Sequence, residues 1–445
     1  MTIARTICLG FIAVIAVGTL LLMMPFSTET GEWGDFVTSL FTSTSAVCVT
    51  GLIVVDTGTY FSSWGEFFLL CLIQVGGLGY MITTTFLILL MGKKFDFRQK
   101  LAMKESFDRP FLQGSRNLII SVFATTLILE SIAAFALSTI FIQDYGFFQG
   151  VWLGIFHAIS AWNNAGFSLF EDSLMGYKTS IPLNLIITVL IIGGGIGYQV
   201  IIECFLWIID KFNRHAHHKF DLSLNFKVVI RTTAILLVLG SIAFFLTESH
   251  NSNTFDNLSL SEKLIASWFQ SVSTRTAGFN TIDISQMSIA GLFVSIGLMF
   301  VGASPSGTGG GIKTTTLSIL LNSTRAVLRG QEKVVMYKRE VPVSLTLKAM
   351  AVVFGSGVTV VTITLIMSLV DPGFEFIAIL FEVVSAFATV GLSTGITGSL
   401  SMLGKLTLVF TMYLGRVGVL LFMGAIVGDP RPSRIHYPQE NLLVG

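Results

Sequence analysis

Charge is the property that this sequence most lacks. Only 12% of its 445 residues are Asp, Glu, Lys or Arg, whereas 52% are apolar and the mean hydropathy is +0.78. A soluble globular domain carries roughly 25% charged residues, so this composition excludes that class. Cysteine is scarce as well: the 4 cysteines form no Cys-x-x-Cys pair, which argues against a zinc cluster or a disulfide framework. We therefore interpret the chain as an integral membrane protein whose cysteines are small packing residues.

Long apolar runs supply candidate membrane spans. A helix needs about 20 residues to cross a hydrocarbon core of about 30 Å. Eight runs satisfy this requirement, at 7–24, 64–91, 118–142, 182–209, 228–246, 289–321, 350–370 and 403–427. The first run ends without an Ala-x-Ala-like cleavage site, so we expect it to be a retained span.

Basic residues are concentrated in alternate loops. The loops at 92–117, 210–231 and 324–348, together with the two ends of the chain, hold 21 of the 27 lysines and arginines. By the positive-inside rule this places both termini in the cytoplasm of a multi-pass protein of the cell membrane. The intervening loops carry mainly Asp and Glu. An acidic outer mouth of this kind raises the local concentration of cations.

One short signature occurs four times. Each copy begins with Phe, continues through Ser and small residues, and ends at a Gly that is followed by Leu or Phe. The glycines, at Gly51, Gly166, Gly278 and Gly391, are 115, 112 and 113 residues apart. The chain is therefore a fourfold repeat, with units at 1–92, 117–210, 225–324 and 341–428 and a cytoplasmic tail at 429–445.

A short segment precedes each repeated glycine. The segments at 35–47, 148–162, 260–273 and 375–387 are too short to span a membrane, but they suit half-membrane helices whose C-terminal dipole ends face a cation. Glycine then permits the unusual backbone in which carbonyls replace the hydration shell of an ion. We expect an all-α membrane protein in which four tandem span, re-entrant helix, span units surround one central pore.

The expected selectivity filter consists of the repeated glycines and the two residues before each of them. Its residues are Val49, Thr50, Gly51, Asn164, Ala165, Gly166, Thr276, Ala277, Gly278, Thr389, Val390 and Gly391, with a cation bound at the glycines. Ordinary loop or helix-contact glycines are the competing interpretation, and four copies at a near-constant interval argue against it. The third segment is one residue shorter between Ser273 and Gly278, so the ring need not be symmetric.

The second half of the third repeat contains the segment 302–313, with five glycines and one proline. Each interior glycine costs a helix about 1 kcal/mol and a proline about 3 kcal/mol relative to alanine, so this span must break midway. The expected gate comprises Gly302, Ala303, Ser304, Pro305, Ser306, Gly307, Thr308, Gly309, Gly310, Gly311, Ile312, Lys313 and Arg416. A phosphate-binding P-loop is a rival for part of this segment, but it needs Gly-Lys in direct succession and Ile312 intervenes. Close helix packing through small residues is the other alternative.

Arg416 is a cation within an apolar run, and such charges usually face a partner or a water-filled cavity. We expect it to lie under the filter, to pair with the 302–313 segment and to slow cation passage. A structural pairing with Glu203 or with a helix C-terminus is the alternative. Lys313, at the end of the segment, is expected to extend toward the membrane interface.

Four further motifs complete a family resemblance. They are Gln74-Val-Gly-Gly-Leu-Gly79-Tyr, Gly193-Gly-Gly-Ile-Gly197-Tyr, the 302–313 segment and Tyr413-Leu-Gly-Arg-Val-Gly418. With the four signatures, the whole chain resembles the Trk/Ktr/HKT superfamily of potassium transporters and is most similar to the membrane subunit of Ktr systems. The resemblance implies potassium selectivity, because all four filter positions are glycine and sodium-conducting members tend to have serine first. It also implies that the 302–313 segment gates conduction.

The same resemblance implies partners and physiology. Such membrane subunits form homodimers on an octameric cytosolic ring of a nucleotide-binding regulatory subunit, take up K⁺ during osmotic adaptation and are stimulated by Na⁺. We expect membrane lipids at the basic loops, no organic cofactor in this chain and no nucleic acid partner.

Other function classes fit the sequence less well. A sodium-conducting member of the superfamily is the nearest alternative, and Gly51 argues against it. An alternating-access transporter would have inverted repeats and helices broken in paired positions, whereas these repeats share one orientation and only the third inner span is expected to be strongly broken. An enzyme would need a nucleophile and base or metal ligands within the spans, and none is recognisable.

Overall fold

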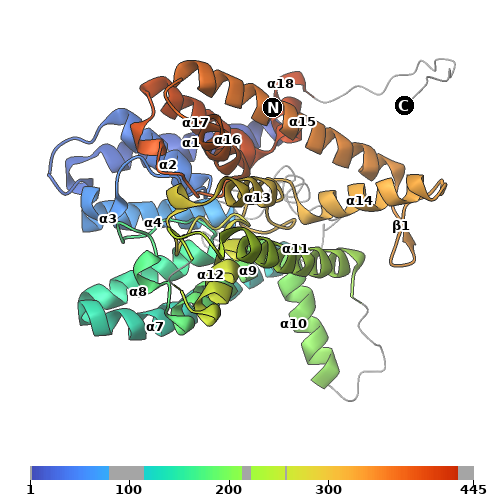
Figure 1. Ribbon diagram of the computed structural model, residues 1–445, viewed down its shortest axis with the longest axis horizontal. Coiled ribbons are helices and arrows are strands. Elements are labelled where there is room, and N and C mark those ends of the chain that lie inside the picture. Colours follow the sequence, from blue (N-terminus) through green and yellow to red (C-terminus); the bar gives the residue numbers. More distant parts are fainter. Residues whose placement is uncertain (1–2, 80–114, 213–221, 256–257, 429–445) are drawn as a thin grey trace.

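The computed structural model describes residues 3–79, 115–212, 222–255 and 258–428, and this part of the chain is mostly helical (Figure 1). Four long apolar helices have the length and composition to cross a membrane. They are α1 (Ile3–Met23), α7 (Ser115–Tyr145), α11 (Leu224–Glu248) and α15 (Val343–Val370). The tail at 429–445 and most of the basic loop at 92–117 lie outside the described residues.

A short helix follows each long one and ends just before a signature glycine. These helices are α2 (Phe36–Val47), α8 (Phe147–Trp162), α12 (Leu260–Ser273) and α16 (Phe376–Ala388). Their starts are fixed locally: Asp35 accepts a hydrogen bond from Thr38 N (2.9 Å), and Ser259 with Glu262 forms a capping box. The four short helices expected from the sequence are confirmed to within one residue at each end.

A second set of helices completes each group: α4 (Ser63–Leu78), α9 (Ile181–Ile196), α13 (Ile289–Phe300) and α17 (Met402–Val417). The expectation that only the third inner span is strongly broken is wrong. Helix α10 (Tyr198–Phe212) leaves α9 at an angle of 102°, and α18 (Val419–Val427) leaves α17 at 94°. The breaks fall at Gly197 (φ +97°) and Gly418 (φ +88°), whose backbone cannot continue a right-handed helix.

These breaks change the number of candidate spans. By length and composition, the described residues contain four helices able to cross a membrane, or up to six if each bent pair is one span, rather than the expected eight. Helices α4 and α13 are apolar but short, with 16 and 12 residues. The run expected at 64–91 continues beyond the described residues. The run at 289–321 is interrupted, as expected, and resumes as α14 (Thr314–Leu328).

The helices pack in a closed cycle. Each long helix contacts the short helix of its own group, and each second helix contacts the short helix of the next group: α4 packs on α8, α9 on α12, α13 on α16, and α17 on α2. The last contact joins the fourth group of helices to the first (Figure 1). This arrangement brings the C-terminal ends of all four short helices, and the glycines that follow them, to the centre of the molecule.

Small residues allow this close approach. In each of three second helices, one glycine lies against a backbone carbonyl at the end of the short helix of its own group, so that a methyl group there would overlap the carbonyl. The pairs are Gly76 with Val47, Gly194 with Trp162, and Gly415 with Phe387. These glycines therefore determine how closely the C-terminal end of each short helix approaches the second helix of its group.

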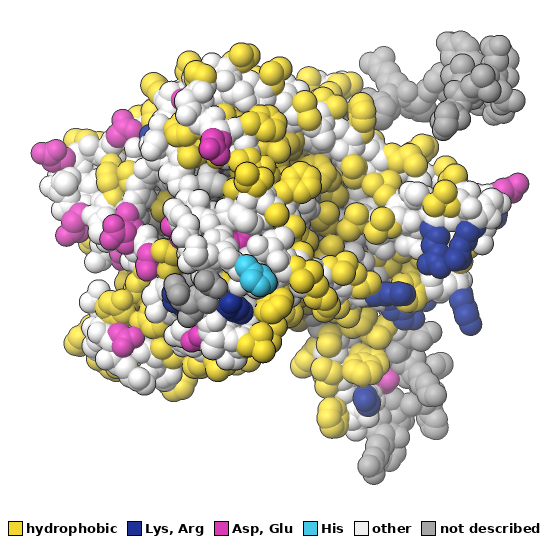
Figure 2. Space-filling model, in the orientation of Figure 1, with side chains coloured by type: hydrophobic (Ala, Val, Ile, Leu, Met, Phe, Trp, Pro, Cys, Tyr) yellow, Lys and Arg dark blue, Asp and Glu magenta, His cyan; other side chains and the backbone are white. Residues whose placement is uncertain are grey.

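The remaining elements are short. They are α3 (Thr57–Tyr60), the strands β1 (Val335–Met336) and β2 (Arg339–Glu340) of one antiparallel hairpin, and 3-10 turns at Pro25–Ser27, Met175–Tyr177, Ile284–Gln286 and Thr397–Ser399. All four cysteines are free, and Cys71 is exposed whereas Cys8 and Cys48 are buried. Figure 2 shows Asp and Glu mainly at the end of the molecule that holds α2, α3 and α8, and Lys and Arg mainly at the opposite end, near α14 and β1.

Candidate functional site

The four signature glycines form a closed ring at the centre of the fold. A Cβ atom added to Gly51 would lie 3.0 Å from the Cα of Gly166, and one added to Gly166 would lie 2.8 Å from the Cα of Gly278. The corresponding distances are 3.3 Å from Gly278 to Gly391 and 3.0 Å from Gly391 back to Gly51. Segments more than a hundred residues apart in sequence therefore meet glycine against glycine, and the ring has no room for a side chain.

The backbone around each glycine has the same unusual conformation. All four glycines have positive φ angles, between +70° and +93°. The residue two positions earlier also has positive φ in every copy: Val49, Asn164, Thr276 and Thr389. The residue between them does not. When the sign of φ alternates along a segment, successive peptide units point their backbone polar groups to the same side. A short backbone segment can then present several polar groups to one ion. Left-handed non-glycine residues cost about 1–2 kcal/mol each, so four of them in register indicate a functional constraint.

The signature serines hold these segments in place. Backbone N–H groups of Thr50, Ala165 and Val390 donate to the carbonyls of Ser45 (2.7 Å), Ser160 (2.8 Å) and Ser385 (2.8 Å), five residues earlier. In the shorter third segment, Ala277 N donates to Ser273 O, four residues earlier (3.0 Å). This hydrogen bond therefore spans one residue fewer than in the other copies, which compensates for the shorter segment, and the ring still closes.

The serine hydroxyls make a second set of anchors. Gly51 N and Gly391 N donate to the Oγ atoms of Ser45 (3.0 Å) and Ser385 (3.1 Å). In the other two copies the direction is reversed, because the hydroxyls of Ser160 and Ser273 donate to the carbonyls of Phe167 (2.7 Å) and Phe279. The copies with Leu after the glycine thus differ from those with Phe.

Polar oxygens without protein partners gather at the same place. The hydroxyls of Thr50, Thr276 and Thr389 are buried and, among the described residues, have no hydrogen-bond partner. A buried hydroxyl left without a partner costs about 1–3 kcal/mol. Three such groups within the expected filter therefore indicate a ligand that these hydroxyl oxygens can coordinate.

A vestibule of about 410 Å³ opens on one side of the ring. All four signature glycines line it, and so do four carboxylates: Asp56, Glu171, Asp172 and Asp283. In the described part of the chain, no basic side chain lines this vestibule. The negative charge would attract cations to the mouth of the ring.

The segment 302–313 lies on the other side of the filter segments. It folds back on itself, with Ala303 N donating to Gly310 O (3.2 Å) and Ile312 N to Phe300 O (3.3 Å). Side chains added at Gly309 and Gly310 would collide with the Thr276 and Thr389 hydroxyls. The glycines of this segment therefore let it pack directly against the filter threonines.

Hydrogen bonds tie the segment to the break between α9 and α10. Ser304 N donates to Gly195 O (3.0 Å), Thr308 N to Gly194 O (3.1 Å), and Tyr198 N to Ser306 O (3.2 Å). The Asn164 amide, in the orientation that satisfies its neighbours, donates to Thr308 Oγ1 (3.0 Å). One filter residue and one helix break are thus coupled to the segment.

Three cationic side chains donate to carbonyl oxygens of this segment. Arg416 donates to Thr308 O through one nitrogen and to Gly76 O, in the last turn of α4, through the other. The expected pairing of Arg416 with the segment is therefore present, and so is the alternative contact with a helix C-terminus. The Glu203 carboxylate accepts from Ser223 N (3.2 Å).

The other two cations depart from expectation. Lys313 does not extend away from the segment, because its ammonium donates to Gly309 O (2.7 Å). Arg275, which the sequence places with the outer loops, is 7% exposed and donates to Gly302 O (2.8 Å). Its position three residues before a filter glycine is the signal that could have identified it.

The residue after the signature Phe is a second feature that the sequence reasoning did not exploit. His157 forms hydrogen bonds with Leu153 O (2.8 Å) and with the hydroxyl of Ser168, two residues beyond Gly166 (3.0 Å). In the fourth copy, Glu382 accepts from the hydroxyl of Ser393, two residues beyond Gly391 (2.6 Å). Both short helices therefore use a buried side chain to brace the vestibule wall.

A buried polar cluster supports the second filter segment from behind. The Asn163 amide donates to Gln74 Oε1 (2.8 Å) and to Glu130 Oε1 (3.0 Å), and Gln74 donates to Glu130 Oε2 (3.1 Å). Glu130 is 4% exposed. A carboxylate within the apolar run at 118–142 was the available sequence signal.

Comparisons with known proteins agree with this geometry. The model of the TrkH family, described as cation transport protein, matches residues 6–427. The chain is 36% identical to the potassium/sodium uptake protein NtpJ of Enterococcus hirae, over 99% of this chain and 97% of the relative. It is also 36% identical to the Ktr system potassium uptake protein B of Bacillus subtilis, over 99% of this chain and 96% of the relative. These relatives are uptake proteins and not enzymes.

The fold agrees with a solved structure. The potassium transporter TrkH from Vibrio parahaemolyticus superimposes with a TM-score of 0.71 at 17% identity, covering 95% of this chain and 85% of that one. At this identity the likeness concerns the fold alone. The match of the family model and the full-length relatives show that the chain belongs to the TrkH family of cation transport proteins.

Proposed function

We propose that this chain is the ion-translocating membrane subunit of a potassium uptake system of the Ktr type. The observation that carries the proposal is the closed ring of four positive-φ glycines beneath an acidic vestibule. Carbonyls of the twelve filter residues would replace the hydration shell of K⁺, and the buried threonine hydroxyls supply further oxygens. The names of the full-length relatives support potassium as the transported ion.

The proposed architecture has four tandem repeats of span, re-entrant helix and span around one pore, with both termini cytoplasmic. The cycle of helix contacts and the segregation of acidic and basic residues support it. In this arrangement the two bent pairs count as inner spans whose lower parts turn away at Gly197 and Gly418. The acidic vestibule then faces outward, and the 302–313 segment closes the pore beneath the filter.

The proposed gate is the 302–313 segment together with Arg416. Its packing against Thr276 and Thr389 supports an obstructing position, and the hydrogen bonds of Arg416 to Thr308 and Gly76 support a closed state stabilised by this cation. Arg416→Gln should remove one of the two donor groups of this side chain and increase K⁺ flux. Lys405→Gln on the same helix is the matched control. Unchanged flux in Arg416→Gln would count against the gating role.

Several relatives are named as proteins of a Ktr system, which supports the presence of further components. We propose a homodimer controlled by an octameric cytosolic ring of a nucleotide-binding subunit, with stimulation by Na⁺ and a role in osmotic adaptation. A sodium-conducting protein is the second candidate, because one relative is named a potassium/sodium uptake protein.

Flux into proteoliposomes tests the proposal and separates the candidates. The wild-type chain should carry K⁺ far faster than Na⁺, and Gly278→Ser should reduce this ratio, because its Cβ would lie 2.6 Å from Val390 O. Equal fluxes of the two ions in the wild type would support the sodium-conducting candidate. A mutant ratio equal to that of the wild type would remove the glycine ring from the selective site.

A further inference from the structure

A second cavity of about 410 Å³ lies away from the filter, between α11, α14 and the β1–β2 hairpin. None of the residues that line the filter or the vestibule belongs to it. Its walls are mainly apolar, and the charged side chains among them are Arg231 of α11 and Arg325 of α14. Among the residues that the structure describes, no acidic side chain lines the cavity.

The lining residues follow an amphiphilic order. On α11, Arg231 is followed at helical spacing by Ile235 and Leu239, while on α14 Arg325 is preceded at the same spacing by Leu321 and Leu317. Helices α11 and α14 contact each other and run in opposite directions (Figure 1). Residues four apart share one face of a helix, so both arginines lie at one end of the cavity and both apolar stripes lead away from them.

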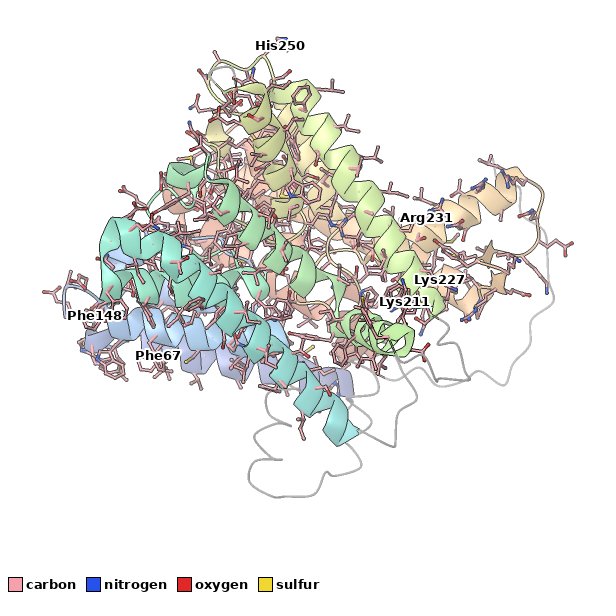
Figure 3. The ribbon with its side chains drawn as sticks, turned by 90° about the horizontal axis from the view of Figure 1, so that it is seen from below. Phe67, Phe148, Lys211, Lys227, Arg231 and His250 are labelled. Carbon is pink, nitrogen blue, oxygen red and sulfur yellow. The ribbon has the colours of Figure 1, made fainter. Side chains whose placement is uncertain are left out.

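The basic end lies within a wider positive surface. Figure 3 shows Lys227 and Arg231 near the start of α11 together with Lys211 at the end of α10, far from His250 beyond the other end of α11. Arg231 and Arg325 are exposed, and neither has a carboxylate partner among the residues that the structure describes. Two unpaired guanidinium groups beside an apolar wall match a phosphate that is attached to a hydrocarbon chain.

We infer that this cavity binds one anionic phospholipid, with its phosphate between Arg231 and Arg325 and an acyl chain along the leucine and isoleucine stripes. A soluble phosphate would use the arginines and leave the apolar stripes exposed to water, which is why a lipid is the better occupant. The volume lies within the usual range of about 300–1,000 Å³ for ligand sites.

The site has a mechanical consequence. Helix α14 begins at Thr314, immediately after the 302–313 segment, so a lipid that links α14 to α11 also restrains the end of that segment. This consequence rests on the proposed gating function, whereas the binding itself does not.

Lipid binding is tested directly on the purified full chain. After delipidation, phosphatidylglycerol, phosphatidylcholine and inorganic phosphate are added separately, and bound lipid is counted by native mass spectrometry on the monodisperse fraction. Phosphatidylglycerol should bind the wild type. R231Q/R325Q should weaken this binding roughly thirtyfold, because two basic contacts with the anionic lipid are lost. R329Q/K338Q removes the same charge from the residue that follows α14 and from the hairpin, both outside the cavity, and should bind like the wild type.

A second variant tests the apolar part of the cavity. Ile235→Trp fills the stripe while keeping both arginines, and it should lose phosphatidylglycerol. If R231Q/R325Q binds this lipid like the wild type, or if R329Q/K338Q loses it equally, the site is refuted. Binding of inorganic phosphate as strong as that of the lipid would identify a soluble anion site and overturn the lipid assignment. Because these measurements do not involve transport, they stand apart from any failure of the proposed potassium conduction.

Discussion

Gly166→Ala tests the glycine ring most sharply. An alanine Cβ would lie 2.7 Å from Ala277 O and 2.8 Å from the Cα of Gly278. Ordinary contact begins at 3.4 Å, so the carbonyl must move by about 0.7 Å, away from the position that we propose for ion coordination. The left-handed backbone adds about 1–2 kcal/mol of strain and the crowding about 1–3 kcal/mol.

The crowding should appear as lost selectivity. Every 1.4 kcal/mol corresponds to a factor of ten, so a crowding cost of this size should lower the K⁺ over Na⁺ flux ratio by roughly fivefold to a hundredfold. The assay is isotope or fluorescence flux into proteoliposomes of matched protein content, with each cation in turn.

Gly146→Ala is the matched control for backbone strain. Gly146 has φ +80°, precedes the first residue of α8, and has no atom within 4 Å of the added Cβ. This variant carries the strain without the crowding and should keep the wild-type flux ratio. If Gly166→Ala keeps that ratio too, or if Gly146→Ala loses it equally, the ring does not determine selectivity.

Three other substitutions probe the supports of the ring. Ser385→Ala removes the oxygen that accepts from Gly391 N, worth about 0.5–1.5 kcal/mol, and should lower the K⁺ over Na⁺ flux ratio about twofold to tenfold. Glu382→Gln replaces a carboxylate that accepts from Ser393, and the Gln NH₂ cannot accept in its place, so the apparent affinity for K⁺ in flux assays should fall severalfold. Gly194→Ala would drive a methyl group into the carbonyl at the end of α8, and it should lower the midpoint of thermal unfolding by several degrees.

Each of these changes has a control of the same chemistry. Glu375→Gln alters an exposed residue that caps α16 without a side-chain hydrogen bond, and an effect equal to that of Glu382→Gln would show a general charge effect. Gly297→Ala lies in α13 with no atom within 4 Å and should raise the unfolding midpoint slightly. For Ser385, a flux ratio that Ser385→Thr keeps and Ser385→Ala lowers would support the hydrogen bond, because Thr retains the hydroxyl. An unchanged ratio in Ser385→Ala would contradict it.

The sequence determined the features that depend on composition and local spacing. Low charge and long apolar runs determine that this is a membrane protein, because a hydrocarbon core does not accommodate segments rich in charged residues. The short helices were predicted to within a residue, since capping residues such as Asp35 and Ser259 start them and a backbone that turns left-handed before each glycine ends them. The start of α15 was less accurate, seven residues late, because Lys348 masks the helix in an apolar count.

Only the tertiary structure decided how these elements close into a site. The positive φ values at Gly197 and Gly418 break two more helices, and a glycine in sequence does not reveal whether its neighbours require that conformation. Arg275 donates to Gly302 O and Lys313 donates to Gly309 O. Both hydrogen bonds depend on how the 302–313 segment folds, because that fold leaves these carbonyls available as acceptors. The lipid cavity likewise exists only because α11 and α14 meet in opposite directions. Local pattern specifies helices and their ends, whereas the partners of a buried charge or carbonyl are chosen by packing between segments far apart in the chain.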